Sequence, residues 1–358
     1  MVARVIPRIR VAGSHREVGR AVGVATAVTL REAVAFDDVL PAGRSRDEQL
    51  ALALRYREAT RAGTPWLVEE IDGAAEGAEV DPIALFAASI EEIWSVRPSQ
   101  ATGGIVVDGR CSDLVAGPPA TADGHLWVAH TNDLSPASRD DAVAVEWRVP
   151  GEPVVFSLGI GPWISVGWND AGLSLTGNEL SPDDEVVGVP RLLMVREQLT
   201  AGSMDEALGM ALRPDRSSSY NTVFGTPDGR FVNVEGSATD AELEGLGVSG
   251  RFAHTNHYVC SRMQRHEGDP AYAVLSGIRL DRAQALLDAA DDGSIDADWL
   301  RAALSDHATE PSICRHPETD GRSATAFWCI VDVTAGEIHF GLGNPCEPGE
   351  ERFAFASA

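Results

Sequence analysis

The sequence predicts a layered α+β fold. Apolar residues recur at helical spacing through much of residues 1–96, whereas the sequence after Cys111 alternates in short strand-like runs. Turn pairs such as Asp123-Gly124 and Pro150-Gly151 separate these runs, and helical patterns return later in blocks. Helices and antiparallel strands that come in blocks, rather than in strict alternation, favour packed layers of sheet and helix.

The first 96 residues are expected to be mostly helical after one short strand at 4–11. Two helices should begin where a capping residue precedes proline, at Thr64-Pro65 and Asp81-Pro82. The expected helices lie at 14–39, 46–61, 65–76 and 82–96. Residues 97–110 break this pattern with Pro, Ser and paired Gly, which is typical of a linker.

Residues 111–358 are expected to carry most of the strands, and Cys111 opens the first of them. Further strands are predicted from alternating hydrophobicity at 125–131, 142–148, 153–159, 163–168, 172–177, 221–224, 230–235, 324–333 and 337–341. Helices are predicted at 190–199, 204–212, 270–290 and 298–305. The third of these starts with the cap-then-proline pair Asp269-Pro270.

The chain contains no lysine, so all 29 of its basic residues are arginine. A chain without lysine cannot hold pyridoxal phosphate as a Schiff base. It also has no P-loop lysine, no kinase strand lysine and no Ser-x-x-Lys acylation site. These mechanisms are excluded from composition alone.

The formal net charge of −25 has the wrong sign for a broad nucleic-acid or anionic-membrane surface. We interpret it as a well-solvated surface. No apolar run approaches the roughly 20 residues that span a bilayer, and the first residues lack the continuous apolar core of a signal peptide. We therefore expect a cytoplasmic protein with neither a nucleic-acid nor a membrane partner.

The five cysteines are widely spaced, and none of them forms a C-x-x-C pair. An odd number at such spacing predicts free thiols rather than a disulfide framework or a structural zinc site. The sequence gives no reason to expect a cofactor or a metal. Cys111 directly follows the linker, but a cysteine that opens a buried strand is more often inert packing.

Other short segments along the whole chain change this interpretation of Cys111. They are GSHREVG at 13–19, EIDGAAEG at 70–77, CSD at 111–113, HTND at 130–133, WNDAGLSLTGNE at 168–179, HTNHY at 254–258, DH at 306–307, PSICRHP at 311–317 and GNPC at 343–346. In order and spacing the chain resembles the acyl-coenzyme A:6-aminopenicillanic acid acyltransferase family. This family consists of autoproteolytic cysteine acyltransferases and hydrolases of the N-terminal-nucleophile superfamily.

The resemblance implies one four-layer αββα sandwich, with two antiparallel sheets between helical layers. It also implies that the precursor cuts itself between Arg110 and Cys111. The products would be an α chain of residues 1–110 and a β chain of residues 111–358, which stay together in one domain. The sequence departs from the family at Arg110, because these proteins often have Gly before the cysteine.

The chemistry expected of Cys111 follows from its residue type. Its thiol attacks the Arg110 carbonyl, and the new terminus then carries a thiol and an α-amine. An α-amine titrates near pH 8, so it can serve as the base for its own nucleophile. The resemblance implies that Asp133 orients this amine.

The same resemblance assigns Asn178 and Asn256 to the oxyanion hole, where a donor can contribute about 3 kcal/mol. By itself, Gly177-Asn178 would fit a turn better than an oxyanion hole. Arg322 corresponds to an active-site arginine of related enzymes, although a surface ion pair would also explain an arginine there.

We expect an autoprocessing cysteine enzyme that cleaves a linear amide, or transfers its acyl group, through a thioester on Cys111. Its partners would be a small amide or acyl-thioester substrate and the two fragments of its own precursor. One alternative is an unprocessed, inactive relative that serves as a binding or scaffold protein. Another is a conventional cysteine hydrolase that works through Cys314 and His316 without processing.

Overall fold

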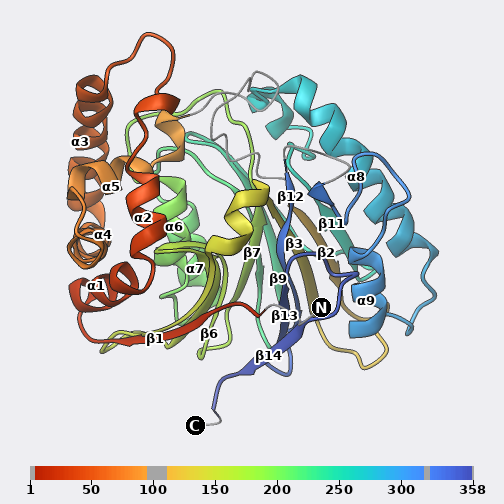
Figure 1. Cartoon of the computed structure of the whole chain (residues 1–358). Coiled ribbons are helices and arrows are strands. Elements are labelled where there is room, and N and C mark those ends of the chain that lie inside the picture. The colour runs from red at the N-terminus through yellow and green to blue at the C-terminus, as the bar shows by residue number, and fades with distance from the viewer. Residues whose placement is uncertain (1–4, 95–110, 318–322, 357–358) are drawn as a thin grey trace.

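Two stacked β-sheets with helices on both outer faces form the protein (Figure 1), as seen in a computed structural model that describes residues 5–94, 111–317 and 323–356. Helices α1 to α7 cover the larger sheet, and α8 and α9 cover the smaller one. The predicted four-layer α+β sandwich is therefore confirmed. Both sheets are apolar on both faces, which is why each needs a helical cover as well as a partner sheet.

The larger sheet has eight strands in the order β1-β4-β5-β6-β7-β8-β9-β10. Its strands are β1 (Arg8–Ala12), β4 (Ala142–Arg148), β5 (Val155–Ile160), β6 (Trp163–Asn169), β7 (Ser174–Asn178), β8 (Asn221–Gly225), β9 (Phe231–Gly236) and β10 (Ala241–Glu244). All neighbours are antiparallel except β1 and β4, which run parallel with Arg8 opposite Ala144. This pair corrects the expectation of purely antiparallel sheets.

The smaller sheet has six strands in the order β11-β2-β3-β12-β13-β14. Its strands are β2 (Ser112–Ala116), β3 (Trp127–Leu134), β11 (Arg251–His254), β12 (Ala324–Asp332), β13 (Glu337–Leu342) and β14 (Glu350–Ala354). Its inner face packs on the larger sheet, and Phe327 and Phe340 lie there in one buried cluster with Phe156 of β5. This aromatic and aliphatic core holds the two sheets face to face.

The helices are α1 (His15–Ala25), α2 (Ala27–Ala33), α3 (Arg46–Gly63), α4 (Pro65–Ala78), α5 (Pro82–Ala88), α6 (Arg191–Gln198), α7 (Met204–Ala211), α8 (Pro270–Ala289) and α9 (Ala297–Leu304). The helix predicted at 14–39 divides at Thr26, whose hydroxyl donates to the Val22 carbonyl. The helix predicted at 82–96 ends at Ala88 and is followed by a 3₁₀ turn, Glu91–Ile93.

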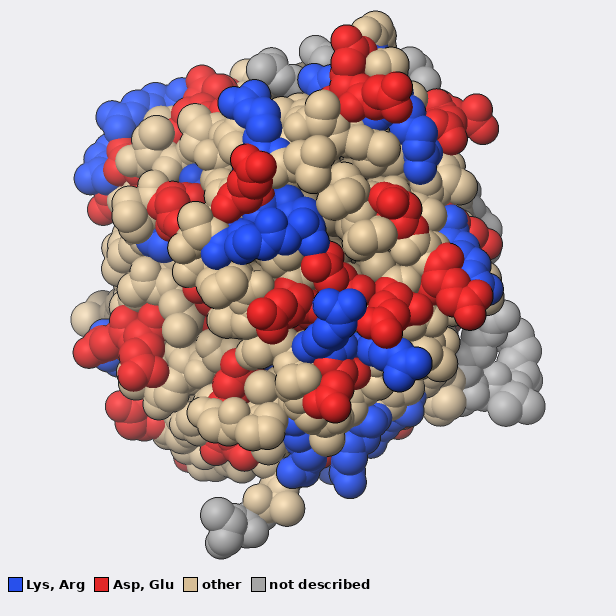
Figure 2. Space-filling model, turned by 90° about the vertical axis from the view of Figure 1, so that its left-hand side faces the viewer, with Lys and Arg blue, Asp and Glu red and all other residues tan. Residues whose placement is uncertain are grey.

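Charged side chains of both signs are interspersed over the face formed by the helices at the left of Figure 1. Figure 2 shows this face, on which the arginines lie beside acidic residues and form no continuous basic area among the residues described. Ion pairs such as Arg16–Glu76 and Arg31–Glu79 belong to this pattern. Within residues 5–94, 111–317 and 323–356, every helix is too short or too polar to cross a bilayer.

Candidate active site

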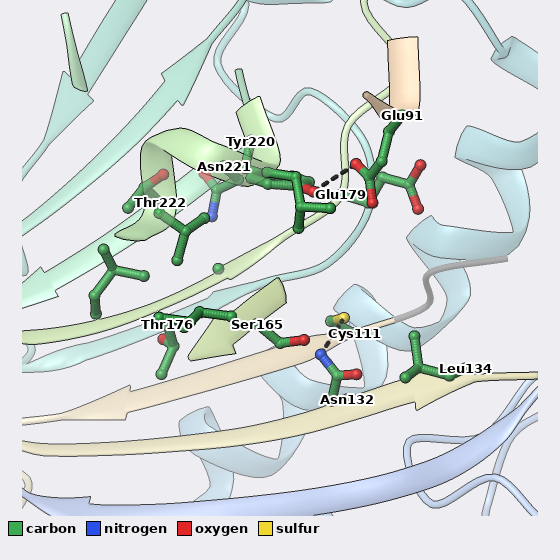
Figure 3. Close-up of a pocket in the computed structure, with 15 residues that line it drawn as sticks. Glu91, Cys111, Asn132, Leu134, Ser165, Thr176, Glu179, Tyr220, Asn221 and Thr222 are labelled. Carbon is green, nitrogen blue, oxygen red and sulfur yellow. Dashed lines mark hydrogen bonds between the residues drawn. The ribbon is translucent and has the colours of Figure 1, made fainter. Parts of the chain in front are cut away.

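Cys111 stands immediately before β2 at the wall of a cavity between the sheets (Figure 3), with 5% of its surface exposed. The lining comes from both sheets, from α6 and from the 3₁₀ turn at Glu91. The residues are Glu91, Cys111, Asn132, Leu134, Ile164, Ser165, Leu175, Thr176, Gly177, Glu179, Leu192, Val195, Tyr220, Asn221 and Thr222. The cavity holds about 70 Å³, far less than the roughly 300–1,000 Å³ of a typical ligand pocket.

The pairing of β2 with β3 places four polar side chains on one face of the sheet. Ser112 lies opposite Thr131, and Asp113 lies opposite His130. Because side chains alternate along a strand, Cys111, Asp113, His130 and Asn132 share the face toward the larger sheet. The Asn132 amide nitrogen points at the Cys111 sulfur from 3.7 Å (Figure 3).

His130 and Asp113 form a fully buried imidazole–carboxylate pair, with 3.0 Å between Nδ1 and Oδ1. Thr176 of β7 donates its hydroxyl to the same Asp113 oxygen at 2.7 Å and so ties the pair to the larger sheet. Burial alone would lower the pKa of His130, but Asp113 and the nearby Cys111 thiol raise it to about 10. At neutral pH the imidazole is therefore a cation.

Groups around the Cys111 thiol shift its pKa in opposite directions. Burial raises its pKa above the ordinary value, and the negative charge of Asp133 adds to this effect. The positive charge of His130 and the backbone N–H of Asp133 act in the other direction. His130 is the cation beside the thiol that can favour a thiolate.

Asp133 follows Asn132 on β3 and faces away from the cavity, toward the helical layer of α8 and α9. Its carboxylate is completely buried and accepts a hydrogen bond from the Thr325 hydroxyl at 2.8 Å. Burial raises its pKa to about 6, against the lowering effect of the Arg315 and Arg279 charges. The structure thus brings the charge of Asp133 within electrostatic reach of the Cys111 thiol, and its predicted role of orienting the amine stays a prediction.

Arg279 of α8 connects Cys111 with Asn256. Its guanidinium donates to the Cys111 carbonyl at 2.8 Å, to the Ser112 hydroxyl at 3.0 Å and to the Asn256 amide oxygen at 2.7 Å. The Asn256 amide nitrogen donates to the Glu179 carbonyl at 3.1 Å. Asn256 is therefore linked to the Cys111 backbone through Arg279, and its amide orientation is fixed.

Asn178 lies at the end of β7, buried between the sheets. Its amide oxygen is 2.9 Å from His254 Nδ1 and accepts from Asn221 at 3.3 Å. His254 in turn pairs with Glu235 at 2.9 Å, so the amide cannot easily turn over. Its nitrogen is buried without a hydrogen-bond partner among the described residues. A buried, oriented donor left over in this way is what an oxyanion site needs.

Sequence reasoning gave no role to Arg279, His130 or Asp113. The sequence position of Arg279 could have indicated a role, because it falls at helical spacing among the buried positions of α8. These are Tyr272, Ser276, Arg279, Ala283 and Leu287. A charged residue on the buried face of a helix is rare unless it is paired, so its presence there indicates a specific partner. Arg110 and Arg322, which the sequence analysis singled out, lie outside the described residues.

Two stacked sheets between helical layers, with a buried cysteine just before β2, the second strand of the smaller sheet, are the arrangement expected of the N-terminal-nucleophile class of amide hydrolases and acyltransferases. The sequence model described as acyl-coenzyme A:6-aminopenicillanic acid acyl-transferase matches residues 120–347. The chain therefore belongs to that family, as the resemblance predicted.

Two solved structures illustrate what the fold is similar to. A mutant of conjugated bile acid hydrolase from Clostridium perfringens aligns with a TM-score of 0.44 at 11% identity, covering 69% of this chain and 97% of its own. Penicillin V acylase from Agrobacterium tumefaciens aligns with a TM-score of 0.43 at 12% identity, covering 68% and 86%. No curated protein sequence matches the chain.

Proposed function

We propose that this protein is an autoprocessing cysteine enzyme that cleaves a linear amide, or transfers its acyl group, through a thioester on Cys111. The observation that carries the proposal is the position of Cys111. Cys111 lines a cavity, and its carbonyl accepts a hydrogen bond from the buried Arg279. The chain also belongs to an acyltransferase family. The self-cleavage and the reaction with substrate, described below as two steps, both proceed without a lysine or a resident metal.

The first step is the cut at Arg110–Cys111. The Cys111 sulfur attacks the Arg110 carbonyl carbon, the peptide bond breaks, and the Cys111 nitrogen leaves as an amine. Water then hydrolyses the Arg110 thioester and restores the thiol. His130, held as a cation by Asp113, supports this step because it favours the thiolate before any α-amine exists.

The second step uses the amine that the cut creates. It takes the proton of the Cys111 thiol as sulfur attacks the substrate carbonyl, and it gives that proton to the leaving amine. Asp133 is the carboxylate that would hold the amine in place. Asn178 and Asn256 would donate to the tetrahedral oxygen, and Asn132 is a further amide donor that faces the sulfur.

The cavity wall favours an apolar acyl group. Leu134, Ile164, Leu175, Leu192 and Val195 all line it. Its polar end carries Glu91 and Glu179, both paired with Arg191 at 2.8 and 2.9 Å. An aliphatic acyl chain would lie on the apolar wall, and a water or an amine would resolve the thioester.

N-terminal sequencing of the purified protein tests the proposal. We expect two fragments on a denaturing gel, the larger one beginning Cys-Ser-Asp-Leu, and a single uncut chain for Cys111→Ala. Acyl amides and acyl thioesters should then be turned over by the cut enzyme and not by this variant. An uncut wild-type chain without activity would leave the binding or scaffold role as the correct interpretation.

A second candidate is a cysteine hydrolase that works uncut. The specific observation in its favour is the buried His130–Asp113 pair beside Cys111, since such a pair can activate a thiol without an α-amine. An intact chain that turns over acyl amides and loses activity in Cys111→Ala would select this candidate over the first.

A further inference from the structure

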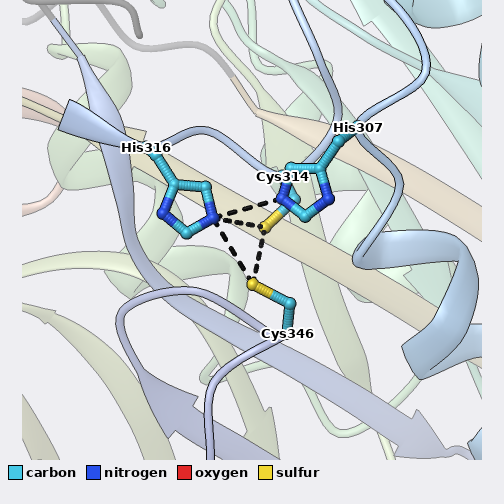
Figure 4. A group of neighbouring side chains, drawn as sticks. All are labelled: His307, Cys314, His316 and Cys346. Carbon is cyan, nitrogen blue, oxygen red and sulfur yellow. Dashed lines mark hydrogen bonds between the residues drawn. The ribbon is translucent and has the colours of Figure 1, made fainter. Parts of the chain in front are cut away.

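Four side chains from two segments of the chain converge beside the smaller sheet, and none of them lines the cavity at Cys111. They are His307, Cys314, His316 and Cys346 (Figure 4). One ligand atom from each lies within 4.8 Å of all the others. His307 follows α9, Cys314 and His316 lie on the segment that leads toward β12, and Cys346 follows β13. Two segments therefore meet at one point, the connection between α9 and β12 with three of the residues and the turn after β13 with the fourth.

Four of the six distances between these atoms are close to those of a metal-centred tetrahedron, and the other two are within 4.8 Å. The two sulfurs are 3.6 Å apart, and the two imidazole Nε2 atoms are 3.1 Å apart. His316 Nε2 lies 3.8 Å from the Cys314 sulfur and 3.4 Å from the Cys346 sulfur. Around tetrahedral zinc, bonds of about 2.3 Å to sulfur and about 2.0–2.1 Å to nitrogen place sulfurs about 3.8 Å, unlike atoms about 3.5 Å and nitrogens about 3.3 Å apart.

We propose that His307, Cys314, His316 and Cys346 bind one structural Zn²⁺ ion. Two thiolates and two neutral imidazoles form a Cys₂His₂ set, and with Zn²⁺ the formal charge sums to zero, which suits a partly buried site. Tetrahedral S₂N₂ ligation selects zinc over hard cations such as Mg²⁺ and Ca²⁺. Four protein ligands leave no open position, so the ion would hold structure rather than act on substrate.

Two other interpretations of the cluster fit less well. A disulfide would place the Cys314 and Cys346 sulfurs about 2.05 Å apart, and they are 3.6 Å apart. The conventional Cys314–His316 dyad considered in the sequence analysis accounts for two of the four residues only. It does not explain why the His307 imidazole and the Cys346 thiol point at the same centre.

The surroundings of the cluster support ligation. The Asn344 side-chain amide donates to the Cys314 sulfur at 3.4 Å and to the Arg315 carbonyl at 2.6 Å. The Cys314 backbone N–H donates to the Asp306 carbonyl at 3.1 Å. Hydrogen bonds of this kind, to the sulfur and to the backbone beside it, hold a thiolate in the orientation that a metal needs.

The proposed ion also fixes a residue of the candidate active site. Arg315 lies between two of the ligands, and its backbone exchanges hydrogen bonds with Thr325, at 3.1 Å to the hydroxyl and 3.0 Å from the Thr325 N–H. The Arg315 charge in turn lowers the pKa of Asp133. A clamp on both sides of Arg315 would hold this cation at its distance from Asp133.

Elemental analysis of the protein, purified without a metal-affinity tag, tests the site. We expect about one zinc per chain, and a loss of at least about tenfold in bound zinc in Cys346→Ser and in His316→Gln. Cys260→Ser is the matched control, because Cys260 is a half-exposed thiol outside the cluster, and it should keep the full zinc content. Removal of zinc with a chelator should lower the thermal midpoint of the wild type, and added Zn²⁺ should restore it.

A measurement on the wild type keeps the test decisive if a variant fails to fold. Replacement of zinc by Co²⁺ should give the visible bands of a tetrahedral site together with a thiolate-to-cobalt charge-transfer band. The proposal is overturned if the purified chain holds no zinc and takes up neither Zn²⁺ nor Co²⁺. It is also overturned if mass spectrometry finds Cys314 and Cys346 joined as a disulfide.

Discussion

At the scale of single residues, the buried pair of His130 and Asp113 determines how the Cys111 thiol ionises. The positive charge of His130 lowers the pKa of a thiol that burial otherwise raises. In His130→Gln this cation is lost, so the alkylation rate of Cys111 should begin its rise at higher pH. A shift of about one unit lowers the rate at neutral pH about tenfold. Iodoacetamide labelling across pH, quantified on the peptide that contains Cys111, measures this.

The matched control for this variant is His125→Gln. His125 also pairs with a carboxylate, Asp332, at 2.8 Å, and this pair raises its pKa as well. Removal of this second pair should leave the alkylation profile of Cys111 in place. Identical profiles for the wild type and both variants would show that His130 has no electrostatic effect on the thiol.

Asp133 imposes a pH-dependent cost on the folded state. Its folded pKa of about 6 lies above the ordinary value of 3.8. The cost is therefore absent below pH 3.8, where the carboxyl is protonated in both states, and it is complete once pH has risen through 6. The shift corresponds to about 3 kcal/mol at pH 8. In the uncut Cys111→Ala background, Asp133→Asn should remove this cost, because Asn keeps the acceptor for Thr325.

Urea unfolding at pH 5 and pH 8 measures the effect. The free energy of unfolding should fall less between these two pH values in Asp133→Asn than in its parent. In a chain that keeps Cys111, Asp133→Asn should also abolish turnover, because this variant lacks the carboxylate. An equal fall in both proteins would mean that Asp133 is ionised in the fold at no cost.

Local motifs made some site residues predictable, whereas register and packing placed the others. Cys111 and Asp133 each stand in a short segment that the family resemblance covers. The significance of His130 depends on its position opposite Asp113 in the β2–β3 ladder. Arg279 reaches Cys111 from a helix more than 150 residues further along the chain, a contact that no local pattern specifies.

At the scale of elements, α1 and α4 approach so closely that only glycine fits at their crossing. A Cβ atom at Gly19 would lie 2.0 Å from the Glu70 carbonyl oxygen, and one at Gly73 would lie 2.2 Å from that of Arg16. Gly73→Ala should therefore force the helices apart and destabilise the protein by at least about 1–3 kcal/mol. The thermal midpoint, measured by circular dichroism, should fall.

Gly277→Ala tests the same substitution where space is open. Gly277 lies within α8, and a Cβ atom there meets nothing within 4 Å. Alanine should stabilise this helix by about 0.5–1 kcal/mol, since it restricts the unfolded chain. A decrease of similar size in both variants would contradict the role of close packing at the α1–α4 crossing.

The strands that sequence analysis missed are polar or short, and tertiary pairing defines them. β10 (Ala241–Glu244) and β14 (Glu350–Ala354) are edge strands rich in acidic residues, which have low β-propensity. β11 (Arg251–His254) has four residues and is recognisable as a strand only from its pairing with β2. The long and strongly alternating strands, such as β12, were predicted almost to their ends.

At the scale of the whole molecule, the proposed α and β chains are interwoven. β1 belongs to the α chain and pairs with β4 of the β chain. The core of α2 to α5 includes Leu193 and Met194 from the β-chain helix α6. A cut between residues 110 and 111 would leave all of these contacts in place, so the two fragments should elute together and unfold in one transition.

A buried ionic network across the two proposed chains makes this association sensitive to pH. His15 bonds Glu70 at 3.0 Å and Glu152 at 2.9 Å, and Arg196 bonds the same two carboxylates at 3.1 and 3.3 Å. Burial alone would lower the pKa of His15, but the two carboxylates raise it to about 9. Its stabilising effect is complete below pH 6.5 and is lost as pH rises through 9.

The urea midpoint of the cut enzyme should therefore fall between pH 7 and pH 10 by more than in His15→Gln. Because His130, with a pKa of about 10, titrates in both proteins, the difference between them isolates His15. Size-exclusion chromatography at both pH values, in urea below the midpoint, separates dissociation from unfolding. Equal midpoint changes in the two proteins would show that the charge on His15 does not hold the chains together, and association would then rest on the shared sheet and the apolar core.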